Sequence, residues 1–251
     1  MSSLPTIVRF LNQILNTRSI SDTSRNGLQV KGVKGIRKIG FAVDACLSTF
    51  QKAKKLGVDL LIVHHGLYWK GQRDKTGVVR DRVRFLKKNK MSLYASHLPL
   101  DLHEKYGNNI ELARLLDLRE IKKFGKYHGM AIGFQGRFFK AVSLRSVARK
   151  LDKKIGSKSL LFLFGRKKIR TIGIVSGGGS SALVEAYKKR LDCFITGEAP
   201  HHVYHEAKDR RQNVILAGHY ETETVGVKAL MPILRKKFGV KTVFVGNKTA
   251  I

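Results

Sequence analysis

The chain has 251 residues, of which 43% are hydrophobic, enough to bury the core of one large domain or of two modest ones. No apolar run is long enough to cross a bilayer, and Cys46 and Cys193 are the only cysteines. The composition therefore argues against a membrane-spanning chain and a disulfide-rich scaffold. We expect a soluble, reduced, cytoplasmic protein with no membrane partner.

The charge balance is strongly basic, with 49 Lys and Arg against 18 Asp and Glu and a formal net charge of +31 at pH 7. Such a charge attracts polyanions through screened Coulomb forces and counterion release, so nucleic acid is a possible partner. The basic residues are nevertheless spread along the chain and form no single tail or arm. A generally cationic surface is the simpler interpretation, and nucleic-acid binding is the alternative.

The N-terminal segment, residues 1–16, has helical spacing of its apolar residues but lacks the basic start and the small-residue cleavage site of a signal peptide. The stretch "SRNGLQV" follows, and its Asn26-Gly27 pair is typical of a tight turn.

Two later segments resemble each other, one starting with "IRKIGFAV" at Ile36 and the other with "IRTIGIVS" at Ile169. Each runs from a β-rich stretch through an amphipathic helical pattern into a short apolar strand, which predicts βαβ in both copies. A shift of 133 positions, read from the sequence, aligns Asp59 with Asp192 and places the pair His64-His65 against Gly197-Glu198.

A second pair of stretches also matches, "LYASHLPLD" at Leu93 and "ILAGHYETE" at Ile215. Both run from an apolar strand into His-x-x-x-acid, so that His97 and Asp101 correspond to His219 and Glu223. Alternating βα units of this kind predict an α/β fold with internally duplicated units, a mostly parallel sheet, and functional residues in loops after the strands.

The segment Gly125–Gly165 separates the two copies and reads as a β-α-β insertion with its own apolar strands. We therefore predict two domains. Residues 1–124 together with 205–251 would form an α/β domain that carries a metal site, and residues 125–204 would form an inserted, smaller α/β domain.

Histidine and carboxylate side chains gather at these predicted strand ends, and they are the ligands that zinc, iron and manganese accept. In an extended strand His64 and His65 would point to opposite faces, so we expect them to serve two neighbouring ions rather than one. His219 and Glu223 share a face if the chain turns helical there, and Asp101 follows His97 in the same way. For any one histidine, a hydrogen-bonded turn residue is the alternative interpretation.

The stretch "VSGGGSSALVEA" passes from a strand into a helix, so backbone N–H groups at Gly177, Gly178, Gly179 and Ser180 could bind an anion. A tight turn with a serine N-cap explains the same residues without a ligand. Further on, "APHHVYHEA" adds His201, His202 and His205, either near the same cavity or on the solvent side of a helix.

In combination, the motifs resemble the NIF-three-like dinuclear metal-centre family, often described as GTP cyclohydrolase I type 2 homologues. They are "NGLQV", "DLLIVHHGLYWKG", "YASHLPLD", "GNN", "SGGGSS", "ITGEAPHH" and "GHYETETVGV", and they extend from residue 26 to residue 227. One departure is Gly66, where proline commonly follows the two histidines in the family.

The resemblance implies two divalent metal ions per subunit, of iron, zinc or manganese, held by His64, His65, Asp101, His219 and Glu223. His97 matches a further family histidine, as a ligand or as a partner of one. The resemblance also implies a homohexameric ring and a metal-dependent hydrolase with a nucleotide such as GTP as substrate. The alternatives are a metal storage or delivery protein without turnover and a basic, ring-shaped nucleic-acid-binding protein.

Overall fold

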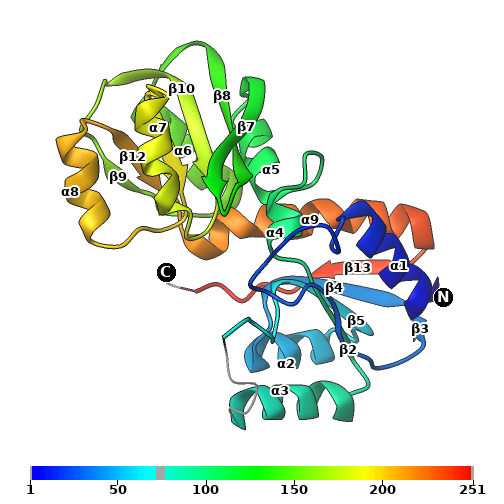
Figure 1. Cartoon of the computed structure of the whole chain (residues 1–251). Helices are drawn as coiled ribbons and strands as arrows, with labels where there is room; N and C mark the ends of the chain where they lie inside the picture. The colour runs from blue at the N-terminus through cyan, green and yellow to red at the C-terminus, as the bar shows by residue number, and fades with distance from the viewer. Residues whose placement is uncertain (1, 72–76, 250–251) are drawn as a thin grey trace. The chain divides into compact units, whose positions relative to one another are not determined.

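The computed structural model describes residues 2–71 and 77–249, which belong to two compact units (Figure 1). Unit 1 is drawn from residues 1–100 and 227–247, and unit 2 from residues 101–226 and 248–251. The unit that contains His64 and His65 takes strands and helices from both ends of the chain. The predicted domains, 1–124 with 205–251 and 125–204, stay predictions. Among the described residues, no helix has the length and apolar character needed to span a bilayer.

Unit 1 is built on a five-stranded sheet in the order β13-β4-β5-β6-β2. Its strands are β2 (Gly27–Val30), β4 (Lys38–Asp44), β5 (Leu60–His65), β6 (Ser92–Ala95) and β13 (Lys241–Phe244). Neighbouring strands are parallel except for β2, which pairs with β6 in the antiparallel sense. A short ribbon of β1 (Ser2–Ser3) and β3 (Gly35–Ile36) completes the strands of this unit.

Helices cover both faces of this sheet (Figure 1). On one face lie α2 (Leu47–Lys55) and α3 (Gly77–Lys88), and Phe50 of α2 and Leu86 of α3 are buried in one core with Leu61 and Val63 of β5. On the other lie α1 (Leu4–Ile14) and the end of α9 (His219–Phe238), where Phe10 packs edge-on against Phe238. The sheet is thus buried on both sides, which explains why β5 reads as a continuous apolar run until its two histidines.

Helix α1 confirms the helical spacing predicted for residues 1–16. Its buried face carries Leu4, Ile7 and Leu11, one helical turn apart. The helix begins after Ser3, whose hydroxyl accepts a hydrogen bond from the Thr6 N–H and so satisfies one of the free N–H groups of the first turn.

Unit 2 has a six-stranded sheet in the order β7-β8-β10-β11-β12-β9. Its strands are β7 (Arg119–Tyr127), β8 (Met130–Ser143), β9 (Leu160–Phe162), β10 (Lys168–Val175), β11 (Cys193–Thr196) and β12 (Asn213–Leu216). Its helices are α5 (Asn108–Leu115), α6 (Leu144–Ile155), the 3-10 turn η1 (Ser180–Ala182), α7 (Leu183–Lys188) and α8 (His202–Asp209). The short α4 (Leu98–Asp101) leads from unit 1 into unit 2, and α9 leads back.

The core of unit 2 lies between its sheet and the helices α5 and α6. Leu112 of α5 and Leu151 of α6 are buried with Ile172, Ile174 and Ile195 of the central strands. Helix α6 is fixed at both ends, because Ser143 caps its start and Gly156 adopts a left-handed conformation at its end.

The prediction of a mostly parallel sheet is confirmed for the sheet of unit 1, where three of the four strand pairs are parallel, and is wrong for the sheet of unit 2. In unit 2 only the pairs β10·β11 and β11·β12 are parallel, and the other three pairs are antiparallel. The reason is local: β7 and β8 are joined by a turn at His128-Gly129 with positive φ at both residues, and so short a connection permits only antiparallel pairing.

The two predicted βαβ segments are formed by β4-α2-β5 and by β10-α7-β11, each with parallel strands. A carboxylate occupies the same place in both. Asp59 accepts hydrogen bonds from the backbone N–H groups of Arg37 and Lys38, and Asp192 accepts them from Arg170 and Thr171. That the units arose by duplication stays a prediction.

Candidate metal centre

Three histidines of unit 1 lie where two parallel strands end. His64 and His65 are the last residues of β5, and His97 follows β6 by two residues. Because β5 and β6 are neighbours and parallel, their carboxyl ends meet at one edge of the sheet. We refer to His64, His65 and His97 as the histidine cluster.

The ring nitrogens of the histidine cluster are close enough to share a bound ion. One ligand atom from each residue lies within 4.8 Å of the others. His64 is fully buried, whereas the His65 and His97 side chains are each 19% exposed, so the cluster can be reached from solvent. His64 and His65 both belong to the regular strand β5, and their ring centroids are 4.7 Å apart. That they serve two neighbouring ions stays a prediction.

Each ring of the histidine cluster places its Nδ1 against an oxygen atom. His64 Nδ1 lies 3.0 Å from the Ser96 carbonyl oxygen, His65 Nδ1 lies 2.8 Å from Asp44 Oδ1, and His97 Nδ1 lies 2.9 Å from Asp22 Oδ1. An acceptor at Nδ1 favours the tautomer with the proton on that nitrogen, which leaves Nε2 with a free electron pair. Metal-binding histidines in proteins are commonly held in this way.

Two of these oxygen atoms belong to carboxylates that the sequence did not single out. Asp44 ends β4 and stands in register with His65, so the pairing of β4 with β5 brings the two together. Asp22 is 8% exposed, and burial raises its pKa, but hydrogen bonds and charge from His97 together with the Asn26 amide and the Ser24 N–H lower it more, to about 2. Asp22 is therefore ionised at neutral pH and can hold the proton of His97 Nδ1.

Asn26 has a role beyond the turn that its Asn-Gly pair predicts. Its Nδ2 donates to Asp22 Oδ2 at 2.8 Å, and its Oδ1 accepts the backbone N–H of His97 at 2.7 Å. The strand that follows, β2, pairs with β6 and forms no hairpin at this point. Asn26 thus ties Asp22 to the backbone of the histidine that Asp22 contacts.

The residues after the histidine pair close one side of the histidine cluster. The Trp69 ring lies edge-on to His97, with centroids 4.9 Å apart, and its Nε1 donates to the Gly66 carbonyl. At Gly66, a Cβ atom would overlap the Gln29 side-chain amide and come within 2.7 Å of Ala95 Cβ. The proline expected from the family would not fit this local packing, because Gln29 occupies its place and accepts the Leu67 N–H.

In unit 2, the predicted pair His219 and Glu223 lies at the start of α9. The chain turns helical at His219, so both side chains share one face, and His219 Nε2 lies 3.3 Å from Glu223 Oε2. His219 Nδ1 contacts Glu198 Oε1 at 2.9 Å. Burial lowers the pKa of His219, but hydrogen bonds and the negative charges of Glu223 and Glu198 raise it more, to about 9. A divalent cation would have to displace that proton.

Asp101, the third predicted ligand in unit 2, is 7% exposed and held by two donors. Asn108 Nδ2 donates to its Oδ1 at 2.8 Å, and the Ser176 hydroxyl donates to the same oxygen at 3.2 Å. The two donors fix the orientation of this carboxylate, a group that metal ions accept as a ligand.

The glycine-rich stretch after β10 packs against Glu223. Gly177 has φ +59°, and a Cβ atom there would overlap Glu223 Oε1 and come within 3.2 Å of His219 Nε2. The Gly177 and Gly179 N–H groups donate to the hydroxyls of Thr222 and Thr196. The prediction of an anion-binding turn named four N–H groups. It now applies to those of Gly178 and Ser180, because those of Gly177 and Gly179 donate to threonine hydroxyls. Neither η1 nor α7 has a side-chain N-cap, unlike the alternative with a serine cap.

The remaining histidines of the sequence motifs lie at the start of α8. His201, His202 and His205 are exposed on or beside α8, and His201 packs edge-on to His205. This agrees with the interpretation as histidines on the solvent side of a helix.

Comparison with known proteins gives a consistent result. A family model described as Duf34/NIF3 (NGG1p interacting factor 3) matches residues 2–250. Two curated proteins named GTP cyclohydrolase 1 type 2 homolog are similar over nearly the whole chain. The Pyrococcus horikoshii protein is 46% identical and the match covers 98% of both chains; the Archaeoglobus fulgidus protein is 42% identical, with 98% of this chain and 99% of its own covered.

Solved structures extend the likeness to the fold. TTHA1606 from Thermus thermophilus is 40% identical with a TM-score of 0.91, and all of both chains is covered. Reduced HcgD from Methanocaldococcus jannaschii is 27% identical with a TM-score of 0.85 over 98% of each chain.

Proposed function

Because the chain belongs to the Duf34/NIF3 family, we propose that it is a dinuclear metal-binding protein that acts as a metal-dependent hydrolase on a nucleotide. The observation that carries this proposal is the histidine cluster, in which every ring has its Nδ1 against an oxygen acceptor and its nitrogen atoms lie within ligand range of one another. Histidines that only stabilise a turn have no need of that common arrangement.

The ligands we propose are His64, His65, Asp101, His219 and Glu223, with His97 as a further ligand beside the first two. Neutral imidazole and carboxylate suit iron, zinc and manganese, so the donor set fits divalent ions without selecting one. When bound, such ions act as Lewis acids and make water nucleophilic at neutral pH.

The protein's own residues would prepare this site for its ions. Asp44 and Asp22 hold the Nδ1 protons of His65 and His97, which keeps both rings in one tautomer and one orientation. Glu198 does the same for His219. The partial exposure of His65 and His97 leaves a route for substrate.

The names of the curated relatives suggest a substrate class. The curated relatives are named for GTP cyclohydrolase, and we propose a purine nucleotide, attacked at a carbon of the guanine ring, as the first substrate to test. Among the residues described above, none donates or accepts in a pattern specific for a guanine edge.

Elemental analysis of purified protein tests the metal site. We expect His65→Ala and Glu223→Gln to reduce the bound metal per chain, while His205→Ala, which changes an exposed histidine of α8, leaves it at the wild-type level. Equal metal content in all four proteins would refute the ligand set.

Turnover is tested separately, with metal-loaded protein and GTP. Product formation that disappears in His65→Ala supports the hydrolase. Full metal content without any turnover of purine nucleotides would support the alternative, a protein that stores or delivers metal.

We further propose that the protein is a homohexamer, because the family resemblance implies one. Sedimentation equilibrium would then give a mass about six times the 28.2 kDa of one chain. A monomeric or dimeric mass would overturn this part of the proposal without affecting the metal site.

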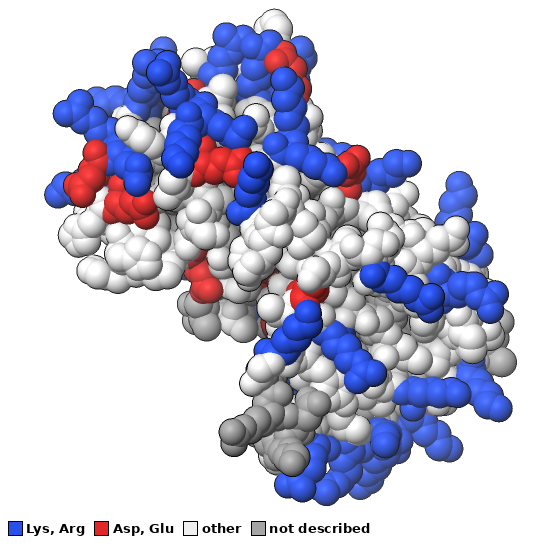
Figure 2. Space-filling model, viewed as in Figure 1, with Lys and Arg blue, Asp and Glu red and all other residues white. Residues whose placement is uncertain are grey.

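A second candidate function, binding of single-stranded nucleic acid, is favoured by a groove on α3. The groove has a volume of about 640 Å³, and five of its eight lining residues are cations: Arg25, Tyr68, Val79, Arg80, Val83, Arg84, Lys87 and Lys88. Arg25 lies over the Tyr68 ring, 5.7 Å from its centroid. A cationic groove beside an aromatic ring is how sequence-tolerant proteins hold single strands. Figure 2 shows basic side chains over both units, and those of α3 line the lower edge of the visible face.

The salt dependence of binding tests this candidate with a labelled oligouridine. The variant Arg80→Ala/Arg84→Ala/Lys88→Ala should flatten the plot of log K against log salt by about 2, since each contact to a single strand contributes roughly 0.7. A control with the same loss of charge on α6, Arg149→Ala/Lys153→Ala/Lys154→Ala, should keep the wild-type slope. Equal effects of both variants would mean that general surface charge, and not the groove, attracts the strand.

A further inference from the structure

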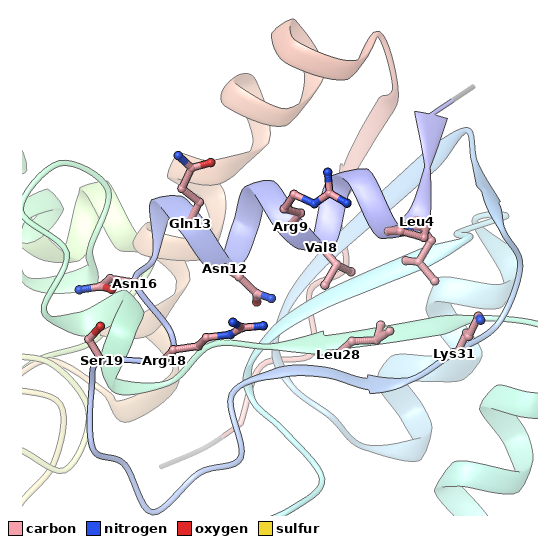
Figure 3. A pocket seen from close by; sticks show the side chains of 11 residues that line it. Leu4, Val8, Arg9, Asn12, Gln13, Asn16, Arg18, Ser19, Leu28 and Lys31 are labelled. Carbon is pink, nitrogen blue, oxygen red and sulfur yellow. The ribbon is translucent and has the colours of Figure 1, made fainter.

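A separate groove of about 800 Å³ lies in unit 1 between α1 and the chain around β2 (Figure 3). Its size is in the range of small-molecule sites. It has an apolar part and a cationic part, and none of the described residues that line it is acidic. The lining residues are Leu4, Pro5, Val8, Arg9, Asn12, Gln13, Asn16, Arg18, Ser19, Leu28 and Lys31.

The apolar part is a strip between α1 and β2. Val8 points down from the helix in Figure 3 and Leu28 lies beneath it. Both are only partly buried, so they leave apolar surface within the groove, and Leu4 closes the strip at the start of the helix. A ligand that fits this strip needs an apolar body.

The polar part contains a fixed hydrogen-bond donor. Asn12 Oδ1 accepts from the hydroxyls of Tyr94 at 2.9 Å and Thr17 at 3.3 Å. Tyr94 is fully buried, and burial raises the pKa of its hydroxyl, which therefore keeps its proton. With the oxygen occupied by two donors, the amide NH₂ of Asn12 is turned into the groove, where Figure 3 shows it pointing toward the Arg18 guanidinium.

The cations of the groove have no acidic partner in the described part of the chain. No carboxylate within 4 Å pairs with Arg9, Arg18 or Lys31 there. Two adjacent donors, one a guanidinium, suit the oxygen atoms of a carboxylate or of a phosphate. Three unpaired cations favour the phosphate, because a phosphomonoester carries about −1.5 to −2 charges at pH 7 and a carboxylate carries one.

We propose that this groove binds an organic phosphomonoester, with the phosphate on Arg18 and Asn12 and an apolar body along Val8 and Leu28. The body could be a nucleobase or a simpler ring. The site shares no residue with the metal centre, so the proposal is independent of the proposed hydrolase.

Isothermal titration calorimetry of the full chain tests the proposal with four probes. Phenyl phosphate and GMP each have a body and a phosphate, inorganic phosphate has no body, and benzoate has the ring with a carboxylate. We expect phenyl phosphate to bind at least about tenfold more tightly than inorganic phosphate and than benzoate. GMP that binds more tightly than phenyl phosphate identifies a nucleotide as the ligand; weaker GMP binding identifies a simpler phosphomonoester.

Two variants locate the phosphate. Arg18→Ala removes an exposed cation, and Asn12→Asp keeps the oxygen that Tyr94 and Thr17 need but replaces the donor with a negative charge. Each should weaken phenyl phosphate binding by about tenfold or more while leaving the metal content unchanged. Arg37→Ala, which removes an exposed arginine of unit 1 outside the groove, is the control and should bind as the wild type does.

Several results would overturn the proposal. They are equal affinity for phenyl phosphate and inorganic phosphate, tighter binding of benzoate, wild-type affinity in Arg18→Ala, or an equal loss in Arg37→Ala. A groove that a second copy of the chain occupies in solution would bind none of the four probes, and that result also overturns it.

Discussion

Replacing Gly177 with alanine should abolish metal binding at the proposed centre while leaving the fold intact. Gly177 contributes no side chain, yet its position decides where Glu223 can lie. A Cβ atom there would overlap Glu223 Oε1, and would lie 3.1 Å from Glu223 Cδ and 3.2 Å from His219 Nε2. Glu223 is 3% exposed, so its carboxylate has little free space to move into and must give up its contact with His219.

Two costs of Gly177→Ala can be separated. The first is backbone strain, because φ is +59° at this position and an alanine there costs about 1 to 2 kcal/mol. The second is the displaced carboxylate. Gly129→Ala isolates the first cost, because Gly129 has φ +80°, belongs to the same unit, and has no atom within 4 Å of the added Cβ. Each kcal/mol lowers Tm by about 2–4 °C in a chain of this size.

Thermal unfolding and elemental analysis of both variants provide the measurement. We expect Gly129→Ala to lose a few degrees of Tm and no metal, and Gly177→Ala to lose at least as much Tm together with its metal. If Gly177→Ala binds as much metal as the wild type, Glu223 is not a ligand. If Gly129→Ala loses its metal as well, reduced stability explains the loss, and the reasoning from the close approach to Glu223 fails.

Three further outcomes follow from single contacts. Asp44→Asn removes the charge that holds His65, and should weaken metal affinity about 10- to 100-fold in a competition with a chelator, whereas an unchanged affinity would mean that Asp44 does not support the site. Burial raises the pKa of Cys46, but hydrogen bonds with the Ser48 and Thr49 hydroxyls lower it more, to below its usual value. Iodoacetamide should therefore modify Cys46 in the native protein well before Cys193, which is fully buried. Peptide mass mapping would show the order of modification. Burial lowers the pKa of His219, but its carboxylate partners raise it more, to about 9. A raised pKa contributes stability that is fully present below the unfolded value of 6.5 and is lost as the pH rises through the folded value, so the Tm of metal-free protein should fall between pH 6.5 and about 9. A Tm that does not change over this range would contradict the ion pair.

The helices and strands that carry the candidate metal ligands could be predicted from the sequence, because their signals are local. The sequence predicts a helix from the apolar spacing of α1 and a strand from the apolar run of β5, and both are confirmed. It also predicts that the i, i+4 pair at the start of α9 shares a helical face, which is confirmed as well. The sheet as a whole could not be predicted in the same way, because pairing depends on which strands meet. The His128-Gly129 pair is a local signal for a hairpin, and it predicts the antiparallel pairing of β7 with β8.

The partners of the histidines were harder to find for a different reason. Asp22 is 75 positions from His97 in the sequence, and no periodic pattern joins them; only the folded chain brings their atoms to 2.9 Å. The contact of Asp44 with His65, by contrast, can be predicted from the sequence. Asp44 ends the strand before the one that carries His65, and parallel neighbours place their last residues side by side.

The two βαβ segments show how one framework can support different chemistry at its strand ends. Asp59 and Asp192 have the same role in both segments, because each carboxylate accepts hydrogen bonds from backbone N–H groups at or near the first strand of its segment. After the strands the segments differ. Gly197 stands where His64 would align, and a Cβ atom there would come within 2.7 Å of the His219 backbone, so no side chain fits. Glu198, the next residue, contacts His219 Nδ1 at 2.9 Å, much as Asp44 contacts His65. The strand end thus provides imidazoles in one segment and the carboxylate that orients an imidazole in the other, which is why a motif search for paired histidines finds only the first.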